Sequence, residues 1–368
     1  MENSSILLTN SGVDKITGGG IVSHNLSEAL KSCSNLKYIF SGQKFQDNKY
    51  EGVPAYTINP SFYGYSPEAD PFFMDYLAYH LLPDEKIDLV QTYGCVFGLT
   101  VEELKRNPEC KVVCDLAPHN IEVSREEHIK WGNNYLYPHL TDDMLWGLYS
   151  RHLRLADVVV VHSNSSADYL KEKARLQKVP EVIPHGCYLP EKIPEYPENI
   201  TPGYFGAIGY DKGVVYAVNA WLNTPHKPET KMVIGGRAAK VFRVEDEFMN
   251  NFLITGYIDG LNDFYKQISV YVHPSVIEGF GITPLEAMAY GRPVIVAEGA
   301  GMSELVTDGK DGFVVPIRDT VAIKDKLVFF QDNPDEIKRM GTEARKTSEK
   351  YTWDIIKKEY VKIYERFL

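Results

Sequence analysis

The chain has 368 residues and a formal net charge of −11, and 44% of its residues are hydrophobic. This length predicts two domains, each able to bury a core without disulfides or structural metals. The acidic balance argues against a nucleic-acid-binding surface, and no apolar run reaches the roughly 20 residues that span a bilayer. Five scattered cysteines give no disulfide framework and the first residues, MENSSILLTNSG, lack a secretory-signal pattern, so we expect a cytoplasmic protein.

Short Val/Ile-rich runs alternate with helix-like stretches along the chain, which predicts parallel βαβ units. The strands expected in the first half are residues 6–9, 38–40, 88–91, 111–114, 157–161 and 181–183. Those expected in the second half are residues 203–208, 231–234, 252–255, 269–273, 293–297 and 312–315. Two such series predict an α/β protein with two doubly wound, Rossmann-like parallel-sheet domains.

A proline-rich segment separates the two series. Four prolines fall between Pro190 and Pro202, a density that excludes a helix or a central strand. We therefore expect a first domain over residues 1–190, a linker over 191–202 and a second domain over 203–350. The apolar spacing in residues 351–368 predicts an amphipathic helix, which we expect to pack back on the first domain.

The loop after the expected strand 269–273 carries the first candidate site, because ligands of open α/β sheets bind at the carboxyl ends of the strands. Glu278 lies in this loop, and a short helix follows it. Thr283 has the features of an N-cap, with Pro284 as the first helical residue. Glu286 stands three residues after Thr283, which leaves two roles open for it, a capping box or a ligand contact. The amides at such a helix N-terminus would hold a phosphate.

From Glu278 to Val294 the sequence reads E-G-F-G-I-T-P-L-E-A-M-A-Y-G-R-P-V. This segment resembles the signature of retaining GT-B glycosyltransferases of family GT4, in which seven residues separate two glutamates. The resemblance continues in the same register through Gly301–Pro316. It implies a GT-B fold with a cleft between the domains. It also implies transfer of a hexose-type sugar from a UDP- or GDP-sugar to an acceptor hydroxyl, with retention of anomeric configuration.

The resemblance further implies roles for single residues. Glu278 is expected to contact the donor sugar near the reacting carbon, and Glu286 to bind the ribose hydroxyls of the nucleotide, which favours ligand binding over capping. Backbone contacts to the sugar and the diphosphate are implied for Phe280, Gly281, Ile282 and Thr283.

A second candidate loop follows the expected strand 203–208 and reads G-A-I-G-Y-D-K-G from Gly206. An ammonium at a helix N-terminus opposes the helix dipole, so Lys212 requires an anion beside it. The family pattern G-R-x-x-x-x-K-G puts its Arg and Lys on the diphosphate. Lys212 matches the Lys, but Ala207 stands in place of the Arg. Arg237, after the next strand, either replaces that charge or is a solvated loop residue.

Two loops of the first half complete the candidate site. Gly18, Gly19 and Gly20 follow the first strand, where the family has a glycine loop that closes on the donor phosphate or the acceptor; a flexible turn is the alternative. His119 follows strand 111–114, where the family often places a histidine near the sugar. Asp115 occupies the commonest position of that histidine, and a loop histidine without a role is the alternative. The expected catalytic set is thus Glu278, His119 and Lys212.

The expected ligands are a nucleotide sugar donor and a carbohydrate, glycolipid or small-molecule acceptor. No Asp-x-Asp pair occurs, so neither a metal nor another cofactor is expected. The basic stretch 171–178 is either a solvated helix face or a peripheral contact with the inner face of a membrane. Two alternatives stay open: another GT-B enzyme, such as a sugar phosphorylase or nucleotide-sugar epimerase, and a non-catalytic sugar-nucleotide-binding protein, to which Ala207 points.

Overall fold

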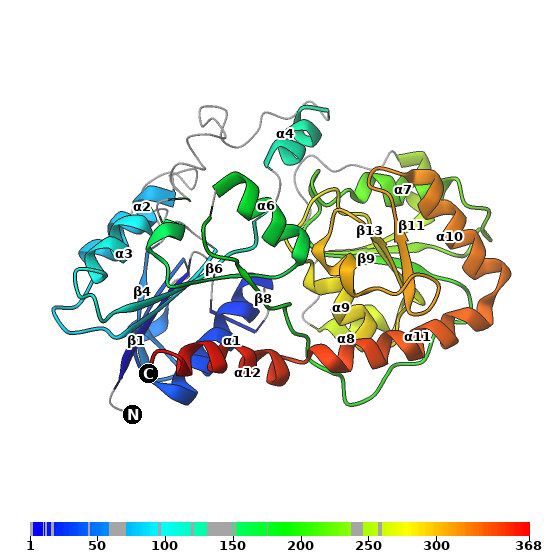
Figure 1. Cartoon of the computed structure of the whole chain (residues 1–368). Helices are drawn as coiled ribbons and strands as arrows, with labels where there is room; N and C mark the ends of the chain where they lie inside the picture. The colour runs from blue at the N-terminus through cyan, green and yellow to red at the C-terminus, as the bar shows by residue number, and fades with distance from the viewer. Residues whose placement is uncertain are drawn as a thin grey trace. The chain divides into compact units, whose positions relative to one another are not determined.

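The structure is a computed structural model, and it describes residues 3–9, 11, 13–15, 18–42, 45–58, 71–94, 97–118, 121–130, 150, 152–174, 176–236, 246–256 and 260–368. The chain forms two compact units (Figure 1). Unit 1 comprises Met1–Pro118, Leu136–Ile183 and Trp353–Leu368, and unit 2 comprises His119–Tyr135 and Pro184–Thr352. Each unit contains one sheet with helices on both faces, which confirms the predicted fold class.

Unit 1 contains an eight-stranded sheet of order β3-β4-β2-β1-β5-β6-β7-β8. Its strands are β1 (Ser4–Thr9), β2 (Asn35–Ser41), β3 (Lys49–Tyr50), β4 (Val53–Thr57), β5 (Leu89–Tyr93), β6 (Lys111–Asp115), β7 (Val158–Val161) and β8 (Glu181–Val182). Its helices are α1 (Gly18–Cys33), α2 (Pro71–His80), α3 (Gly98–Leu104), α6 (Asn164–Ala174) and α12 (Trp353–Glu365), with a 3₁₀ turn η1 (Gln46–Asn48).

All six strands predicted for the first half are present, but the sequence did not predict β3 and β4. These two strands pair antiparallel, whereas β4 joins β2 in the parallel part of the sheet. Gly52, with φ +83°, forms the turn between them. Pro54 lies within β4, and a proline argues against a strand in any reading based on sequence pattern.

Helices α1 and α12 lie side by side on the same sheet, although they come from opposite ends of the chain (Figure 1). The buried residues of α12 are Trp353, Ile356, Tyr360, Ile363 and Tyr364, which form one stripe at helical spacing. The core on one face of the sheet includes Ala78 of α2, Val101 of α3 and Leu170 of α6. Helix α12 therefore completes unit 1, far in sequence from the strands that it helps to cover.

Unit 2 contains a six-stranded, all-parallel sheet of order β11-β10-β9-β12-β13-β14. Its strands are β9 (Pro202–Phe205), β10 (Met232–Gly235), β11 (Phe252–Gly256), β12 (Val270–His273), β13 (Val294–Ala297) and β14 (Gly312–Val315). Its helices are α4 (Ile121–Lys130), α7 (Val214–Leu222), α8 (Leu261–Tyr265), α9 (Ile282–Ala289), α10 (Thr320–Asp332) and α11 (Pro334–Ser348), with 3₁₀ turns η3 (Asp246–Asn251), η4 (Gly301–Leu305) and η5 (Glu349–Tyr351). All six strands predicted for the second half are present.

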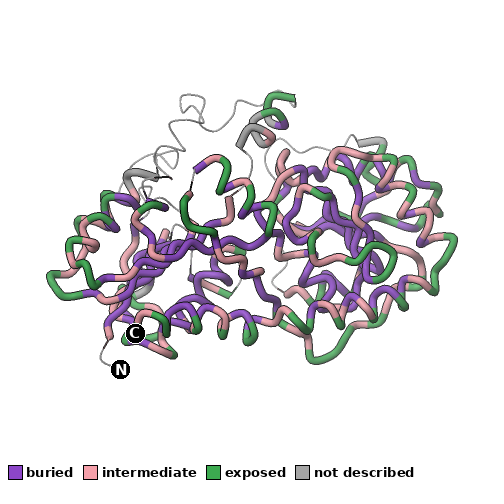
Figure 2. Tube along the Cα trace, viewed as in Figure 1, coloured by how far each residue is buried: buried purple, intermediate pink, exposed green. Residues whose placement is uncertain are grey.

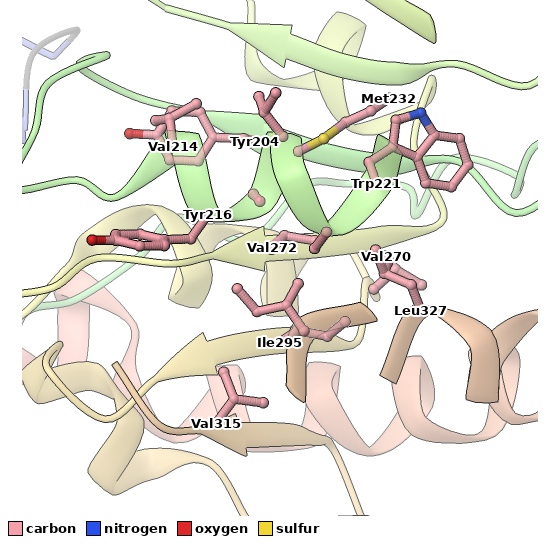
Figure 3. Packing of buried hydrophobic residues seen from close by; sticks show 14 of the residues in the cluster. Tyr204, Val214, Tyr216, Trp221, Met232, Val270, Val272, Ile295, Val315 and Leu327 are labelled. Carbon is pink, nitrogen blue, oxygen red and sulfur yellow. The ribbon is translucent and has the colours of Figure 1, made fainter. Parts of the chain in front are cut away.

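Both faces of the unit 2 sheet are buried along its inner strands, which explains their uninterrupted apolar sequences, whereas Leu253 and Ile254 of the edge strand β11 are exposed. Val270 and Val272 of β12 join a core cluster with α7 and α10, whereas Tyr271 between them joins a second cluster with α8 and α9. Figure 3 shows the first cluster, in which Trp221 of α7 and Leu327 of α10 lie over the strands. Figure 2 shows buried residues running along the strands of each unit.

The strand order of unit 2 places two loops at one position. The order reverses between β9 and β12, so the chain leaves these neighbouring strands in opposite directions. Such a reversal opens a crevice at the carboxyl ends of the two strands, where ligands of doubly wound sheets bind. The loops that follow β9 and β12 are those that carry Lys212 and Glu278.

Candidate functional site

The loops after β9 and β12 are held tightly together. The amide of Val276 donates a hydrogen bond of 2.9 Å to the carbonyl oxygen of Asp211. Gly213, the N-cap of α7, has a left-handed conformation with φ +61°, and a Cβ at this position would lie 2.1 Å from the carbonyl oxygen of Pro274. Only glycine fits this approach, which brings the N-terminus of α7 against the loop of Glu278.

Lys212 and Glu278, predicted separately, form an ion pair with Nζ 2.7 Å from Oε1. The anion that the sequence required beside Lys212 is therefore a carboxylate of the protein itself. Burial alone would raise the pKa of the Glu278 carboxyl, but Lys212 and His273 outweigh burial and hold this pKa well below its usual range. Glu278 is thus ionised at neutral pH.

Sequence reasoning missed two further partners of Glu278. His273, the last residue of β12, places Nε2 2.7 Å from Glu278 Oε2, and the Ser275 hydroxyl donates to the same oxygen at 3.0 Å. The signal was present in the sequence as H-P-S-V-I-E, with both residues directly after a buried strand and shortly before Glu278. Strand-end position alone did not show that their side chains converge on one carboxylate.

The N-terminus of α9 differs from the prediction. The helix begins at Ile282 with Gly281 as its N-cap, and no side chain caps it, so Thr283 is not the N-cap and Pro284 is not the first helical residue. Gly281 has φ +93°, which turns the chain into the helix earlier than a residue with a side chain would allow. The amides of Ile282 and Thr283 lie in the first turn, where no acceptor of the helix itself reaches them.

Glu286 does not form the capping box that the sequence left open. It lies within α9 at 6% exposure, and the described part of the chain offers its carboxyl group no hydrogen-bond partner. Burial raises its pKa to about 7. A buried carboxyl group without a partner is unfavourable for stability, and such groups concentrate at functional sites.

The other predicted donor-site residues have mainly structural contacts. The Gly206 amide donates to the Gly235 carbonyl oxygen at 3.1 Å, and the Tyr204 hydroxyl donates to the carbonyl oxygen of the exposed Ala207 at 2.6 Å. The Phe280 ring is buried edge-on against His185, with ring centroids 5.3 Å apart. Arg237 and His119 lie outside the described residues, so their predicted roles stay predictions.

The glycine run of unit 1 forms the first turn of α1 rather than a free loop. A Cβ on Gly19 would lie 2.4 Å from Ser11 Oγ, and one on Gly20 would lie 2.3 Å from the Asp14 carboxyl carbon. Nothing lies within 4 Å of a Cβ placed on Gly18. Packing therefore accounts for two of the three glycines, and their predicted contact with a ligand stays a prediction.

Asp115, at the end of β6, is fully buried in unit 1. The Tyr360 hydroxyl of α12 donates a hydrogen bond to one carboxylate oxygen, and His162 Nε2 lies 2.9 Å from the other. This carboxylate holds α12 in place and offers no accessible oxygen to a ligand.

Among the described residues, one group of potential metal ligands is found, His24, Glu28 and Glu51 of unit 1. Lys31 Nζ lies 3.0 Å from a carboxylate oxygen of each glutamate, so an ammonium already occupies the position that a cation would take. No helix of the described ranges is long and apolar enough to cross a membrane.

Comparison with known sequences finds a family match in the second half of the chain. Residues 200–333 match the family model of glycosyl transferases group 1. The lipopolysaccharide core biosynthesis mannosyltransferase LpsB of Rhizobium meliloti is 28% identical over 207 residues, which cover 49% of this chain and 57% of the relative. The chain spans about half the length of the curated relatives it matches.

Solved structures match nearly the whole chain, and this likeness shows its fold. Sucrose-phosphate synthase from Thermosynechococcus elongatus matches with a TM-score of 0.81 at 19% identity, covering 99% of each chain. The Anabaena protein HepE, solved in complex with UDP-glucose, matches with a TM-score of 0.72 at 15% identity, covering 98% of this chain and 99% of the other. The likeness confirms the predicted GT-B fold.

Proposed function

Because residues 200–333 match the family model of glycosyl transferases group 1 and the chain has a GT-B fold, we propose that it transfers a sugar from a nucleotide diphosphate sugar to an acceptor hydroxyl. One observation carries the proposal: the ion pair of Lys212 and Glu278 lies at the strand-order reversal of unit 2, beside the first turn of α9. A lysine, an ionised carboxylate and outward-facing amides are the groups that a diphosphate and a sugar require.

Unit 2 is the proposed donor-binding unit. Lys212 and the amides of Ile282 and Thr283 would bind the diphosphate, and the unpartnered Glu286 would accept hydrogen bonds from the ribose hydroxyls. The UDP-glucose complex of HepE supports a nucleotide sugar as the class of donor. We propose UDP or GDP as the nucleotide, with the acceptor, a carbohydrate, glycolipid or small molecule, bound by unit 1.

The proposed reaction is a displacement with retention of configuration. The bond from the anomeric carbon to the diphosphate oxygen breaks, and a bond to the acceptor oxygen forms on the same face of the sugar. The acceptor proton passes to an oxygen of the leaving nucleoside diphosphate. Lys212 and the α9 amides stabilise the charge on that leaving group. Glu278 accepts hydrogen bonds from the sugar and forms no covalent bond to it, and no step requires a metal.

Two measurements test this proposal. Thermal unfolding with UDP, GDP or ADP identifies the base, because a ligand that binds only the folded state raises the melting temperature. Incubation with the matching nucleotide sugars and a panel of acceptors then measures release of nucleoside diphosphate, and the anomer of the product shows retention or inversion. We expect Glu278→Gln to abolish transfer and to leave nucleotide binding within a few-fold of wild type.

Ala207 favours a second candidate function, a sugar-nucleotide-binding protein without turnover. The position where the family has an arginine holds a side chain without charge, and an arginine fork binds phosphate more strongly than a single ammonium. A wild-type protein that binds a nucleotide sugar and releases no nucleoside diphosphate with any acceptor would establish this second function. Restoring the family residue with Ala207→Arg should then tighten diphosphate binding.

A further inference from the structure

The two carboxylate oxygens of Glu278 have different surroundings. Oε2 is held by His273 Nε2 at 2.7 Å and by Ser275 Oγ at 3.0 Å, and these two residues are 3% and 0% exposed. Oε1 is held by Lys212 Nζ at 2.7 Å, and the side chains of Lys212 and Glu278 are 29% and 21% exposed. One oxygen is therefore fixed from the interior, and the other is paired with a lysine that solvent reaches.

The partners of Oε2 are two buried hydrogen-bond donors. His273 Nδ1 is buried, and no group in the described part of the chain accepts a hydrogen bond from it. A carboxylate only accepts hydrogen bonds, so Nε2 donates to Oε2 together with the Ser275 hydroxyl, whereas Lys212 pairs with Oε1.

Other titratable groups around Glu278 do not replace Lys212. Tyr204 of β9 and Tyr271 of β12 are close enough to interact electrostatically with Glu278, but burial raises the pKa of each phenol, so both stay neutral. Glu286 of α9 carries the same sign of charge as Glu278. When Lys212 moves away, only His273 and Ser275 continue to favour the ionised carboxylate.

Building on the proposed function, we propose that His273 and Ser275 are positioning residues that keep Glu278 ionised and oriented while Lys212 exchanges Glu278 for the donor diphosphate. A diphosphate carries more negative charge than one carboxylate, and lysine is a point charge on a flexible stem that can turn to it. Oε1 is then free to accept a hydrogen bond from a sugar hydroxyl. Binding of the diphosphate thereby frees Oε1 of Glu278 to contact the sugar.

The proposal can be tested with three substitutions at one position. In His273→Gln the side-chain amide N–H reaches the place of Nε2, whereas in His273→Asn it reaches only the place of Nδ1. His273→Leu has no donor at all. Ser275→Ala removes the second donor and serves as an independent variant if a substitution of the buried histidine impairs folding, which circular dichroism reports.

The first readout needs no turnover. In protein labelled with ¹³C at glutamate carboxyl groups, the Glu278 signal, assigned by its loss in Glu278→Gln, is followed against pH. We expect the wild-type carboxylate and that of His273→Gln to stay ionised down to about pH 4, and the midpoints of His273→Leu and His273→Asn to rise by about one pH unit or more. Ser275→Ala should shift the midpoint in the same direction by less.

The second readout is the pH dependence of transfer. We expect His273→Leu to lower kcat about tenfold to a hundredfold, with the acidic limb of the kcat profile moved to higher pH, and to bind nucleoside diphosphate as wild type does. His273→Gln should recover most of the loss.

If His273→Leu and Ser275→Ala both keep the kcat, the pH profile and the Glu278 titration midpoint of the wild type, the positioning role is wrong. If the wild-type protein transfers no sugar, the proposed function is wrong instead. The carboxyl titration would still decide the role of His273.

Discussion

Asp115 in unit 1 and Glu278 in unit 2 occupy similar places, at or just after the carboxyl end of a parallel strand. Each has a histidine nitrogen close to one oxygen, at 2.9 Å for Asp115 and 2.7 Å for Glu278. Their remaining partners differ. A buried phenol, Tyr360 of the last helix, covers Asp115, whereas a lysine that solvent reaches pairs with Glu278.

The comparison separates a structural carboxylate from a candidate site. The hydroxyl of Tyr360 is fixed by the packing of α12, so it cannot leave Asp115 without opening the core of unit 1. Lys212 is held to Glu278 mainly by charge, which a diphosphate can outcompete. Position at the end of a strand is therefore not enough to identify a site; the partner must also be one that a ligand can displace.

The largest expected effect follows removal of the displaceable partner. Lys212→Met should lower kcat about 10²–10³-fold, because in the proposed reaction Lys212 stabilises the charge on the leaving group, and should weaken nucleoside diphosphate binding. Lys310→Met is the matched control, since Lys310 is an exposed lysine of the same unit, 3.7 Å from Glu343. Steady-state kinetics and calorimetric titration measure both effects. Unchanged diphosphate affinity in Lys212→Met would remove Lys212 from the donor site.

Glu286 is a third carboxyl group, with neither a buried phenol nor a lysine as its partner. Its effect on the free energy of unfolding extends the comparison. Its pKa of about 7 in the folded protein lies above the usual value near 4.5, so the folded state binds more protons between these values and wild-type stability falls as pH rises through this window. Glu286→Gln cannot ionise. It should be more stable than wild type by about 3 kcal/mol at pH 8 and by under about 1 kcal/mol at pH 5.

Unfolding of both proteins at pH 5 and pH 8 measures this difference. Glu286→Gln should also bind the nucleotide sugar more weakly, since an amide replaces the oxygen that would accept a ribose hydroxyl. An equal gain in stability at both pH values would mean that the wild-type carboxyl is not strained by ionisation. Glu286 would then lose the main physical argument for a ligand-binding role.

The sequence predicted every strand of the two sheets except β3 and β4, because most of the predicted strands are buried and read as apolar runs. It predicted Lys212 and Glu278 because each lies in a glycine-containing loop directly after such a strand. Their direct contact was not predicted, since it depends on the close approach of Gly213 to Pro274, which is a matter of tertiary packing.

Local rules failed where tertiary contacts decide the geometry. Thr283 is a residue type that is favoured at the N-cap, but the chain turns at Gly281, which has a positive φ, and the helix begins at Ile282.

The smallest expected effect tests the structural side of the comparison. Tyr360→Phe removes the hydroxyl that donates to buried Asp115 and should cost about 2 kcal/mol of unfolding free energy, because water cannot reach the carboxyl oxygen that loses its donor. Tyr38→Phe is the matched control: its hydroxyl donates to Glu85 at 2.6 Å, but on the surface, so its loss should cost under about 0.5 kcal/mol. Neither variant should change kcat at temperatures where it is folded. A tenfold lower kcat in Tyr360→Phe alone would show that Asp115 also serves the reaction. The distinction between a structural Asp115 and a functional Glu278, which rests on their different partners, would then be wrong.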